Sequence, residues 1–307
     1  MSYAVRVRAF AKINRSLRVL GTRADGYHEL RTIFQSIALH DTITIRPIRG
    51  PFRLTCDDPA CPVDGTNLIA RAAARMWTAS GRRGAMRDVA IDLRKRIPMQ
   101  AGLGGGSSDA AAVLRALAGQ WRVDAAKVRA AAAALGADVP YFLEGGTALG
   151  LERGDLLFPL IDPPAAWVLV VLPDFGVSTK DAFGWLDLAR TASPSGSARV
   201  LDGAVPAGAP GRRPGPRSTQ RLTFPEAVND LEVPVAARHP EIRRIISAIR
   251  RAGAFEAAMS GSGSAVFGLF SARLAAAAAA KRLASPSRRT LLTRTLNRQK
   301  YQRLAAI

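Results

Sequence analysis

Alternating hydrophobic and polar residues predict strands at several points along the chain. The stretch 4–10 alternates in this way, as does HDTITIRPI (40–48). VAIDLRKRIP (89–98) predicts a third strand that leads into a glycine-rich stretch. The apolar run AWVLVVL (166–172) predicts a buried strand, and AVFGLF (265–270) a further one.

Helical spacing and alanine-rich runs predict helices between these strands. NLIARAAARMWT (67–78) has helical spacing with Asn67 as its N-cap, and an alanine-rich run (124–135) stops at Gly136. Further helices are expected near 240–252 and over 272–284.

Two segments have the composition of irregular surface regions. The segment from about 190 to 221 is rich in Pro, Gly, Ser and Arg, which predicts a mobile surface insertion. After Pro286 the chain is strongly basic, and the pattern leaves open a basic helix or a disordered tail. Because Pro286 separates it from the last predicted helix, we expect the tail 286–307 to be dispensable for activity and to bind polyanions without specificity.

Composition narrows the class of protein. The chain has 307 residues, of which 48% are hydrophobic and 22% charged, as in a globular protein with a substantial core. No apolar run approaches the roughly 20 residues of a membrane span, and the first residues lack the apolar centre of a signal peptide. We therefore expect a cytoplasmic protein that has no membrane partner.

Charge and cysteine content raise two further hypotheses. The net charge of +20 suggests nucleic-acid binding, yet +8 of it lies in residues 281–307 and the rest is spread along the chain. A general compositional bias explains this charge at least as well as a nucleic-acid-binding surface does. A phosphorylated substrate would also favour basic residues near its site. Cys56 and Cys61 lack two further ligands at a zinc-site spacing, so we expect reduced thiols without a function.

The stretch AGLGGGSSDAAAVLRAL (101–117) places four glycines and two serines before an alanine-rich segment. Such a loop leaves N–H groups free, and the start of a helix adds unpaired donors and a positive dipole end, which together suit a phosphate. A glycine-rich turn with Ser107 or Ser108 as the N-cap explains the same residues. The loop alone leaves both interpretations open.

Four segments of the chain carry motifs that have to be taken together. They are AKIN (11–14) followed by DGYHEL (25–30), PMQAGLGGGSSDAAA (98–112), LGADVPYF (135–142) and MSGSGSAVF (259–267). With these motifs in this order, the chain resembles the GHMP small-molecule kinases over residues 8–270, and NDLE (229–232) adds support. Within that family it is most similar to the kinases that act on 4-diphosphocytidyl-2-C-methyl-D-erythritol.

The resemblance implies the catalytic residues and the ATP site. Asp138 matches the family's catalytic base and Lys12 the cation beside it, which would favour the ionised carboxylate and stabilise a developing alkoxide. The ATP-binding residues that it implies are Asn67, Lys95, Pro98, Gly102, Leu103, Gly104, Gly105, Gly106, Ser107 and Ser108. Without the resemblance, Asp138 fits a simple turn residue, and Lys12 and Lys95 fit solvated strand residues.

The resemblance also implies the substrate site. Tyr27 and His28 match the residues that hold the cytosine, where an aromatic ring offers a stacking face and an imidazole a hydrogen bond. Phe183 matches a second aromatic residue from the other lobe, although ordinary core packing explains it nearly as well. Thr179 and Asn14 match neighbours of the erythritol part.

The fold that the resemblance implies is a two-lobed α+β fold. It has a ribosomal S5 domain 2-like N-terminal lobe (1–160) and a ferredoxin-like C-terminal lobe (161–285). The implied activity is ATP-dependent phosphorylation of the substrate's 2-hydroxyl, with Mg²⁺ bridging the nucleotide phosphates and Ser108 as a candidate ligand. The chain departs from the family pattern at Arg15, where an apolar residue is more usual.

Two other functions stand as alternatives. Another GHMP kinase, of the homoserine or mevalonate type, would leave Tyr27 and His28 without a base to hold. A basic nucleic-acid-binding protein would leave Lys12 and Asp138 without a purpose. We therefore expect a small-molecule substrate and no specific nucleic-acid partner, while the sequence does not determine the oligomeric state.

Overall fold

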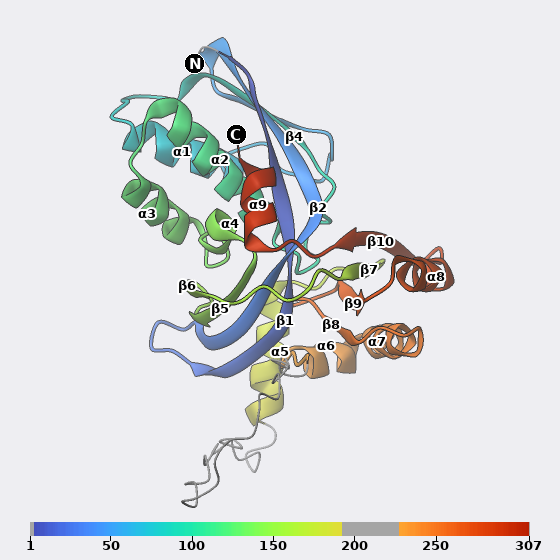
Figure 1. Ribbon diagram of the computed structural model, residues 1–307. Helices are drawn as coiled ribbons and strands as arrows, with labels where there is room; N and C mark the ends of the chain where they lie inside the picture. The colour runs from blue at the N-terminus through green and yellow to red at the C-terminus, as the bar shows by residue number, and fades with distance from the viewer. Residues whose placement is uncertain (1–2, 192–226, 307) are drawn as a thin grey trace, which may run out of the picture.

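The computed structural model describes residues 3–191 and 227–306, and in these ranges the chain forms two β-sheets with helices packed against them (Figure 1). The strands of the first sheet are β1 (Val5–Thr22), β2 (His28–Pro51), β3 (Arg53–Cys56), β4 (Arg87–Arg94), β5 (Thr147–Glu152) and β6 (Leu156–Pro159). The strands of the second are β7 (Trp167–Pro173), β8 (Glu256–Met259), β9 (Val266–Phe270) and β10 (Arg288–Arg294). Each sheet is the centre of one lobe, as the predicted two-lobed α+β fold requires.

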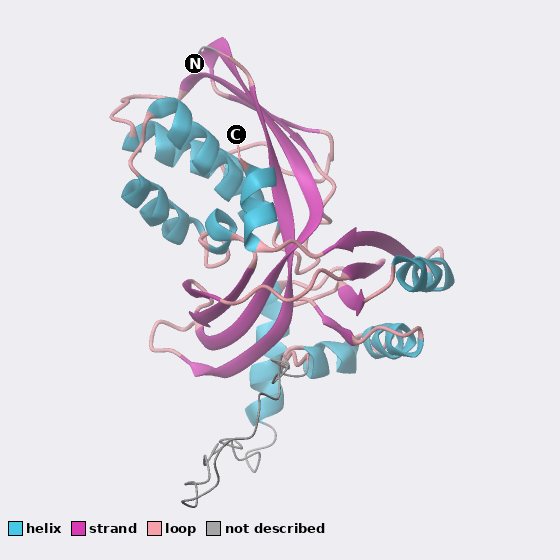
Figure 2. Cartoon of the chain, viewed as in Figure 1, coloured by secondary structure: helices cyan, strands magenta, loops and turns pink. Residues whose placement is uncertain are grey.

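The N-terminal lobe is built on the sheet of order β3-β4-β2-β5-β6, with β1 paired to β2. Its helices are α1 (Leu68–Ala79), α2 (Gly105–Trp121), α3 (Ala125–Leu135) and the short α4 (Tyr141–Glu144), gathered on one side of the sheet (Figure 2). Alternate residues of β2, such as Ile43 and Ile45, share a hydrophobic core with Ile69 of α1 and Leu114 of α2. The predicted helices 67–78 and 124–135 are confirmed as α1 and α3.

Strands β1 and β2 are much longer than the alternation predicted. They pair as antiparallel neighbours and run from the top of the N-terminal lobe down beside the C-terminal lobe (Figure 1). The predicted strands at 4–10 and 40–48 are only parts of them. From Ala9 to Arg15 β1 is buried on both faces, and a strand buried on both faces loses the alternation that would reveal it.

The C-terminal lobe is built on an antiparallel sheet of order β10-β7-β9-β8. Its helices are α5 (Thr179–Thr191), α6 (Glu232–Arg238), α7 (Glu241–Arg251) and α8 (Arg273–Leu283). Ile245 and Ile249 of α7 and Ala276 of α8 share a core with Leu169 of β7 and Phe270 of β9. The order of strands and helices is ferredoxin-like, as the resemblance implied.

The prediction of a basic tail at 286–307 is wrong. Strand β10 lies in this segment and completes the second sheet by pairing with β7. The chain then returns to the N-terminal lobe, where helix α9 (Arg298–Ala305) places Tyr301 beside Phe10, with ring centroids 5.6 Å apart. Tyr301 is 1% exposed and donates a hydrogen bond to the Phe142 carbonyl oxygen (2.7 Å). The segment was predicted to be a tail because it is rich in basic residues. Several of these, such as Arg289, are indeed exposed, but the strand and helix that carry them are part of the fold.

The lobes meet in a shared core and through a buried ion pair. Ala11 and Ile13 of β1 lie in one hydrophobic cluster with Val168 of β7. Arg15, the departure from the family pattern, donates from Nε to Glu256 Oε1 of β8 (3.0 Å), and the two side chains are 8% and 9% exposed. The carboxylate of one lobe therefore balances the buried guanidinium of the other.

The predicted insertion at 190–221 lies, apart from its first two residues, outside the described ranges. Within those ranges no helix is both long and apolar enough to span a membrane. Cys56 and Cys61 are free thiols, and burial raises the pKa of Cys56 to about 12. A thiol with so high a pKa is a poor nucleophile at neutral pH.

Candidate active site

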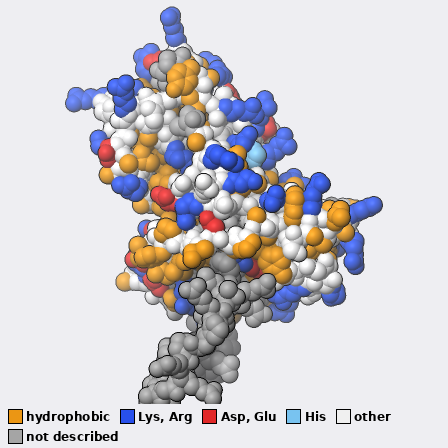
Figure 3. Space-filling view, in the orientation of Figure 1, with side chains coloured by type: hydrophobic (Ala, Val, Ile, Leu, Met, Phe, Trp, Pro, Cys, Tyr) orange, Lys and Arg blue, Asp and Glu red, His pale blue; other side chains and the backbone are white. Residues whose placement is uncertain are grey.

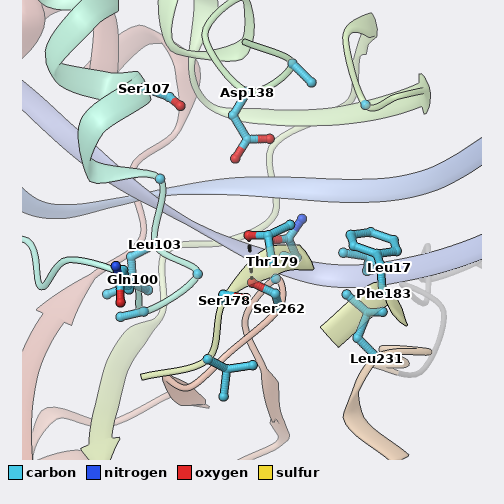
Figure 4. A pocket seen from close by; sticks show the side chains of 18 of the residues that line it. Leu17, Gln100, Leu103, Ser107, Asp138, Ser178, Thr179, Phe183, Leu231 and Ser262 are labelled. Carbon is cyan, nitrogen blue, oxygen red and sulfur yellow. Dashed lines mark hydrogen bonds between the residues drawn. The ribbon is translucent and has the colours of Figure 1, made fainter. Parts of the chain in front are cut away.

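A cavity of about 1110 Å³ lies between the lobes. Predicted site residues that line it are Lys12, Asn14, Tyr27, His28, Lys95, Pro98, Gly102, Leu103, Gly104, Gly105, Gly106, Ser107, Asp138, Thr179 and Phe183. In Figure 4, Ser107 and Asp138 lie on one side of the cavity and Thr179 and Phe183 on the other. The fold therefore brings residues from both lobes to one space.

Helix α2 begins inside the glycine run rather than at a serine. Its N-cap is Gly104, with a φ of 71° in the left-handed region that favours glycine, so the alternative with Ser107 or Ser108 as the cap is wrong. The N–H groups of Gly105, Gly106 and Ser107 open the helix and have no intrahelical acceptor. These donors, together with the positive end of the helix dipole, border the cavity, which is the arrangement that a phosphate requires.

The two serines of this loop have different environments. Ser107 lines the cavity, and Figure 4 shows its side chain on the same side as Asp138. Ser108 is buried and its hydroxyl donates to the Phe10 carbonyl oxygen (2.6 Å), so it supports the loop from behind. Ser108 is therefore not placed to hold a metal ion in the cavity.

The second glycine/serine loop, residues 259–264, packs directly on the first. Ser260 Oγ donates to the Gly102 carbonyl oxygen (2.9 Å), and the N–H of Asn14 donates to Ser260 Oγ (3.3 Å). Asn229 Nδ2 donates to the carbonyl oxygens of Met259 (2.9 Å) and Gly261 (2.8 Å). The NDLE motif thus braces the second loop, which in turn fixes the path of the first.

Gly102→Ala is expected to lower kcat/KM for ATP by about 10²-fold, because misplacing a reacting group by about 1 Å has an effect of that size. The φ of Gly102 is 73°, and a Cβ there would lie 2.0 Å from the Ser260 carbonyl oxygen. The two loops would have to separate. Steady-state kinetics with varied ATP measure the effect.

Gly65→Ala is the matched control, because a Cβ at Gly65 meets nothing within 4 Å and its φ is not in the left-handed region. It should leave kcat/KM for ATP unchanged. Equal activity of the Gly102→Ala and Gly65→Ala enzymes would show that close contact between the loops is not needed.

Lys12 and Asp138, which both line the cavity, form an ion pair, with Lys12 Nζ 3.4 Å from Asp138 Oδ2. The Lys12 side chain is 5% exposed and that of Asp138 33%, so the ammonium is buried and the carboxylate faces the cavity. Lys12 Nζ also donates to Asn14 Oδ1 (2.6 Å), and the Lys12 N–H donates to the Leu103 carbonyl oxygen (3.0 Å). The strand that carries the lysine is thus joined to the glycine loop.

Lys95 lies in the cavity wall, but its ammonium is bound to two carboxylates that sequence reasoning missed. Its Nζ donates to Asp109 Oδ2 (2.9 Å) and to Asp41, and its side chain is 6% exposed. Burial alone would lower the pKa of Lys95, but the charges of Asp109 and Asp41 raise it above the ordinary value. Asp41 also accepts from the N–H of Ile97 (2.8 Å), so the network fixes the strand end before the glycine loop.

Asn67 does not line the cavity. Its Oδ1 accepts from the N–H of Ile69 (2.8 Å) as the N-cap of α1, and its amide donates to the Pro62 carbonyl oxygen. The N-cap prediction is confirmed. Both polar atoms of the Asn67 side chain are bonded within the protein in this way. Asn67 therefore differs from most of the other residues predicted to bind ATP, which line the cavity.

An aromatic group forms the end of the cavity near α5. The His28 and Phe183 rings stack with centroids 4.5 Å apart, and Tyr27 is 58% exposed with the Arg153 guanidinium 5.3 Å from its ring centroid. His28 Nε2 lies 2.9 Å from Asp187 Oδ1, and since a carboxylate oxygen only accepts, Nε2 is the donor of this hydrogen bond and Nδ1 is the ring nitrogen left for a ligand. Asp187 and Arg153 were not found from the sequence.

Two further polar residues, Thr179 and Asn14, line the cavity. Thr179 Oγ1 is 3.2 Å from Ser262 Oγ of the second loop, the contact drawn as a dashed line in Figure 4. Asn14 Nδ2 donates to Thr32 Oγ1 (2.7 Å) while its Oδ1 accepts from Lys12. Asn14 therefore fixes the position of the ammonium.

Comparison with known proteins agrees with this architecture. A sequence profile described as GHMP kinases N terminal domain matches residues 67–146, and one described as GHMP kinases C terminal matches residues 219–287. A solved structure of a homoserine kinase from Cytophaga hutchinsonii has a TM-score of 0.66 at 17% identity, covering 98% of this chain and 97% of that one. At that identity the likeness shows the fold alone.

More similar relatives define a narrower family. The 4-diphosphocytidyl-2-C-methyl-D-erythritol kinase of Solibacter usitatus is 44% identical over 86% of this chain and 80% of its own, and that of Moorella thermoacetica 40% identical over 94% and 98%. A solved 4-(cytidine 5'-diphospho)-2C-methyl-D-erythritol kinase has a TM-score of 0.73 at 32% identity, covering 95% of this chain and 99% of that one. This chain belongs to the GHMP kinases, and within them to the family of 4-diphosphocytidyl-2-C-methyl-D-erythritol kinases.

Proposed function

We propose that the protein transfers the γ-phosphoryl group of ATP to the 2-hydroxyl of 4-diphosphocytidyl-2-C-methyl-D-erythritol, giving the 2-phosphate and ADP. The observation that carries the proposal is the Lys12–Asp138 pair, which lies in one cavity with the glycine loop and the aromatic group. A kinase needs a polyphosphate cradle, a cation and a base for the acceptor hydroxyl. The N–H groups at the start of α2, the Lys12 ammonium and the Asp138 carboxylate can supply these three parts.

Asp138 acts as the base in this proposal. Its carboxylate accepts the proton of the 2-hydroxyl while the 2-oxygen forms a bond to the γ-phosphorus and the bond from that phosphorus to the bridging oxygen of ADP breaks. Lys12, 3.4 Å away, stabilises negative charge on the attacking oxygen. Asn14 holds the ammonium in place by accepting its hydrogen bond.

The glycine loop holds the phosphates of ATP in this proposal. The N–H groups at the start of α2 bind the phosphate oxygens, and the second loop keeps them in position through Ser260 and Gly102. Since Lys95 is engaged by Asp41 and Asp109, it shapes the adjacent wall. In this proposal Asn67 and Ser108 affect ATP binding only indirectly. Asn67 caps helix α1, and Ser108 supports the glycine loop from behind.

The donor set fits Mg²⁺ held mainly by the nucleotide. The described residues contain no group of three or more His, Cys, Asp or Glu side chains that could enclose a metal, whereas Ser107 offers a hydroxyl at the phosphate loop. Magnesium commonly takes few protein ligands and several phosphate or water oxygens. Ser107 would hold it, and when bound it would screen the phosphate charge.

The aromatic group recognises the cytosine in this proposal. Tyr27 and Phe183 offer faces for stacking, and His28 Nδ1, left free by the bond from Nε2 to Asp187, accepts from the 4-amino group of the base. Thr179 and Asn14 lie where the erythritol part would pass on its way to Asp138.

A comparison of acceptors tests the function. ADP release is measured with ATP and the cytidine substrate, with homoserine, with mevalonate and with no acceptor, and the product is identified by phosphorus NMR. Turnover should require the cytidine substrate and yield its 2-phosphate. Faster turnover with homoserine or mevalonate would assign the chain to another GHMP kinase activity.

Tyr27→Ala and His28→Ala are each expected to raise KM for the cytidine substrate and to leave KM for ATP unchanged. Loss of one base–aromatic stack is worth ~1–3 kcal/mol, which is about a fivefold to 150-fold change in affinity. Tyr3→Ala, which removes an aromatic ring that is 64% exposed, is the control. A rise in both KM values by the same factor would point to disruption of the cleft instead.

A further inference from the structure

A second pocket lies on the outer face of the first sheet. It has a volume of about 390 Å³ and is lined by Arg6, Arg8, His40, Thr42, Leu304 and Ala306. None of these residues lines the active-site cavity. We call this space the outer-face pocket.

Strand register explains why its polar residues converge. Arg8 of β1 lies opposite Thr42 of β2, and directly opposed residues of an antiparallel pair point to the same face. Their neighbours Val7 and Ile43 are buried in the core on the other face. The end of α9 closes one side of the pocket through Leu304 and Ala306, so the pocket exists only because the C-terminal segment folds back.

Among the described residues, arginines outnumber carboxylates around the pocket. Arg94 of β4 lies opposite Thr42 in the same cross-strand row as Arg8, and Arg6 is two residues along β1. Among the described residues none of these three arginines has a carboxylate partner, whereas Arg46 nearby is paired with Asp92 at 2.9 Å. Figure 3 shows Lys and Arg side chains gathered on the N-terminal lobe beside a histidine. Like charges on one face of a sheet repel one another, and a bound anion would offset that repulsion.

His40 is fixed in a position that suits an anion. Its Nδ1 lies 2.9 Å from the Ala38 carbonyl oxygen, which can only accept, so Nδ1 carries a proton. The ring also packs on Phe10, with centroids 5.2 Å apart. Nε2 is therefore the ring atom left for a ligand, and with a proton it becomes a donor beside the hydroxyl of Thr42.

We propose that the outer-face pocket binds a phosphate-class oxyanion, as free phosphate or as the phosphate group of a small metabolite. Two guanidinium groups, a hydroxyl and an imidazole supply donors on several sides, which is the chemistry that a tetrahedral oxyanion requires. The site is independent of phosphoryl transfer and uses none of its residues.

The three histidines of the chain allow a direct test by proton NMR of the imidazole C–H groups. His40 reports on the outer-face pocket, His28 on the active-site cavity, and His239, stacked on Phe175, on neither. Inorganic phosphate is titrated into the full-length protein at constant pH and constant ionic strength. A saturable shift of the His40 signal, distinct from any shift of His28, is the expected result.

Substitutions then locate the binding groups. Arg8→Gln should weaken phosphate binding at His40 roughly tenfold or more, the usual effect of losing a hydrogen bond to a charged group. Arg71→Gln, which removes an exposed arginine of α1, should leave the His40 titration unchanged. A parallel titration with glycerol 3-phosphate tells free phosphate from a phosphate monoester, the tighter ligand being the better match.

Two results would overturn the proposal. One is a His40 signal that chloride at the same ionic strength shifts as much as phosphate does, since that would be screening alone. The other is equal phosphate affinity of the Arg8→Gln and unsubstituted proteins, measured from the His40 signal while the His239 signal stays unshifted in both.

Discussion

Asp138→Asn is expected to lower kcat by about 10²–10⁴-fold, the range over which general base catalysis contributes. The amide keeps the size of the side chain beside Lys12 Nζ but cannot accept the proton of the 2-hydroxyl. ATP contacts the glycine loop rather than Asp138 in the proposed arrangement, so KM for ATP should stay within about twofold. Steady-state kinetics with both substrates measure the two constants.

Asp124→Asn provides the matched control for this substitution. Asp124 is an exposed N-cap of α3 that accepts from the Ala126 N–H (2.7 Å), and asparagine caps helices equally well. Its kcat should equal that of the unsubstituted enzyme. An Asp138→Asn enzyme that keeps more than about a tenth of normal kcat would remove Asp138 from the role of base.

Ending the chain after Ser285 is expected to destroy activity by unfolding part of both lobes. The cut removes β10 from the edge of the second sheet and removes Tyr301 from the core beside Phe10. Removing one large buried aromatic side chain costs about 3–5 kcal/mol, which alone lowers Tm by about 10 °C. Circular dichroism during heating and the kinase assay at 25 °C measure the two effects.

A chain that ends after Ala305 keeps both β10 and α9 and is the control for the truncation. It should retain a Tm within a few degrees of the full chain, because the residues removed lie beyond the last helix. Normal Tm and activity in the chain that ends at Ser285 would mean that the C-terminal strand and helix are not part of the stable fold.

Helices with local end signals were predicted closely from the sequence. Asn67 caps α1 by bonding to a residue two positions on, and Gly136 ends α3, so the information lies within a few neighbouring residues. The start of α2 could not be fixed from the sequence, because both serines are good caps by type. Only the backbone shows that Gly104 adopts the left-handed conformation and starts the helix first.

Strands in contact with both lobes could not be predicted to their full length. The middle of β1 is buried on both faces, so Lys12 and Asn14 interrupt the hydrophobic pattern without leaving the strand. Strand β10 was missed for a related reason. Its residues are arginine, threonine and leucine at a sheet edge, and pairing with β7, far away in the sequence, is what makes it a strand.

By itself, the sequence determined the family and the two glycine loops, and it singled out Lys12, Asp138 and the aromatic residues as candidates, because motifs are short runs of neighbouring residues. The tertiary structure alone decided how those residues are supported. Lys95 is held by Asp41, 54 positions away, and His28 by Asp187, 159 positions away. Ion pairs and hydrogen bonds depend on distance in space, falling off over a few ångströms, and separation along the chain does not reveal that distance.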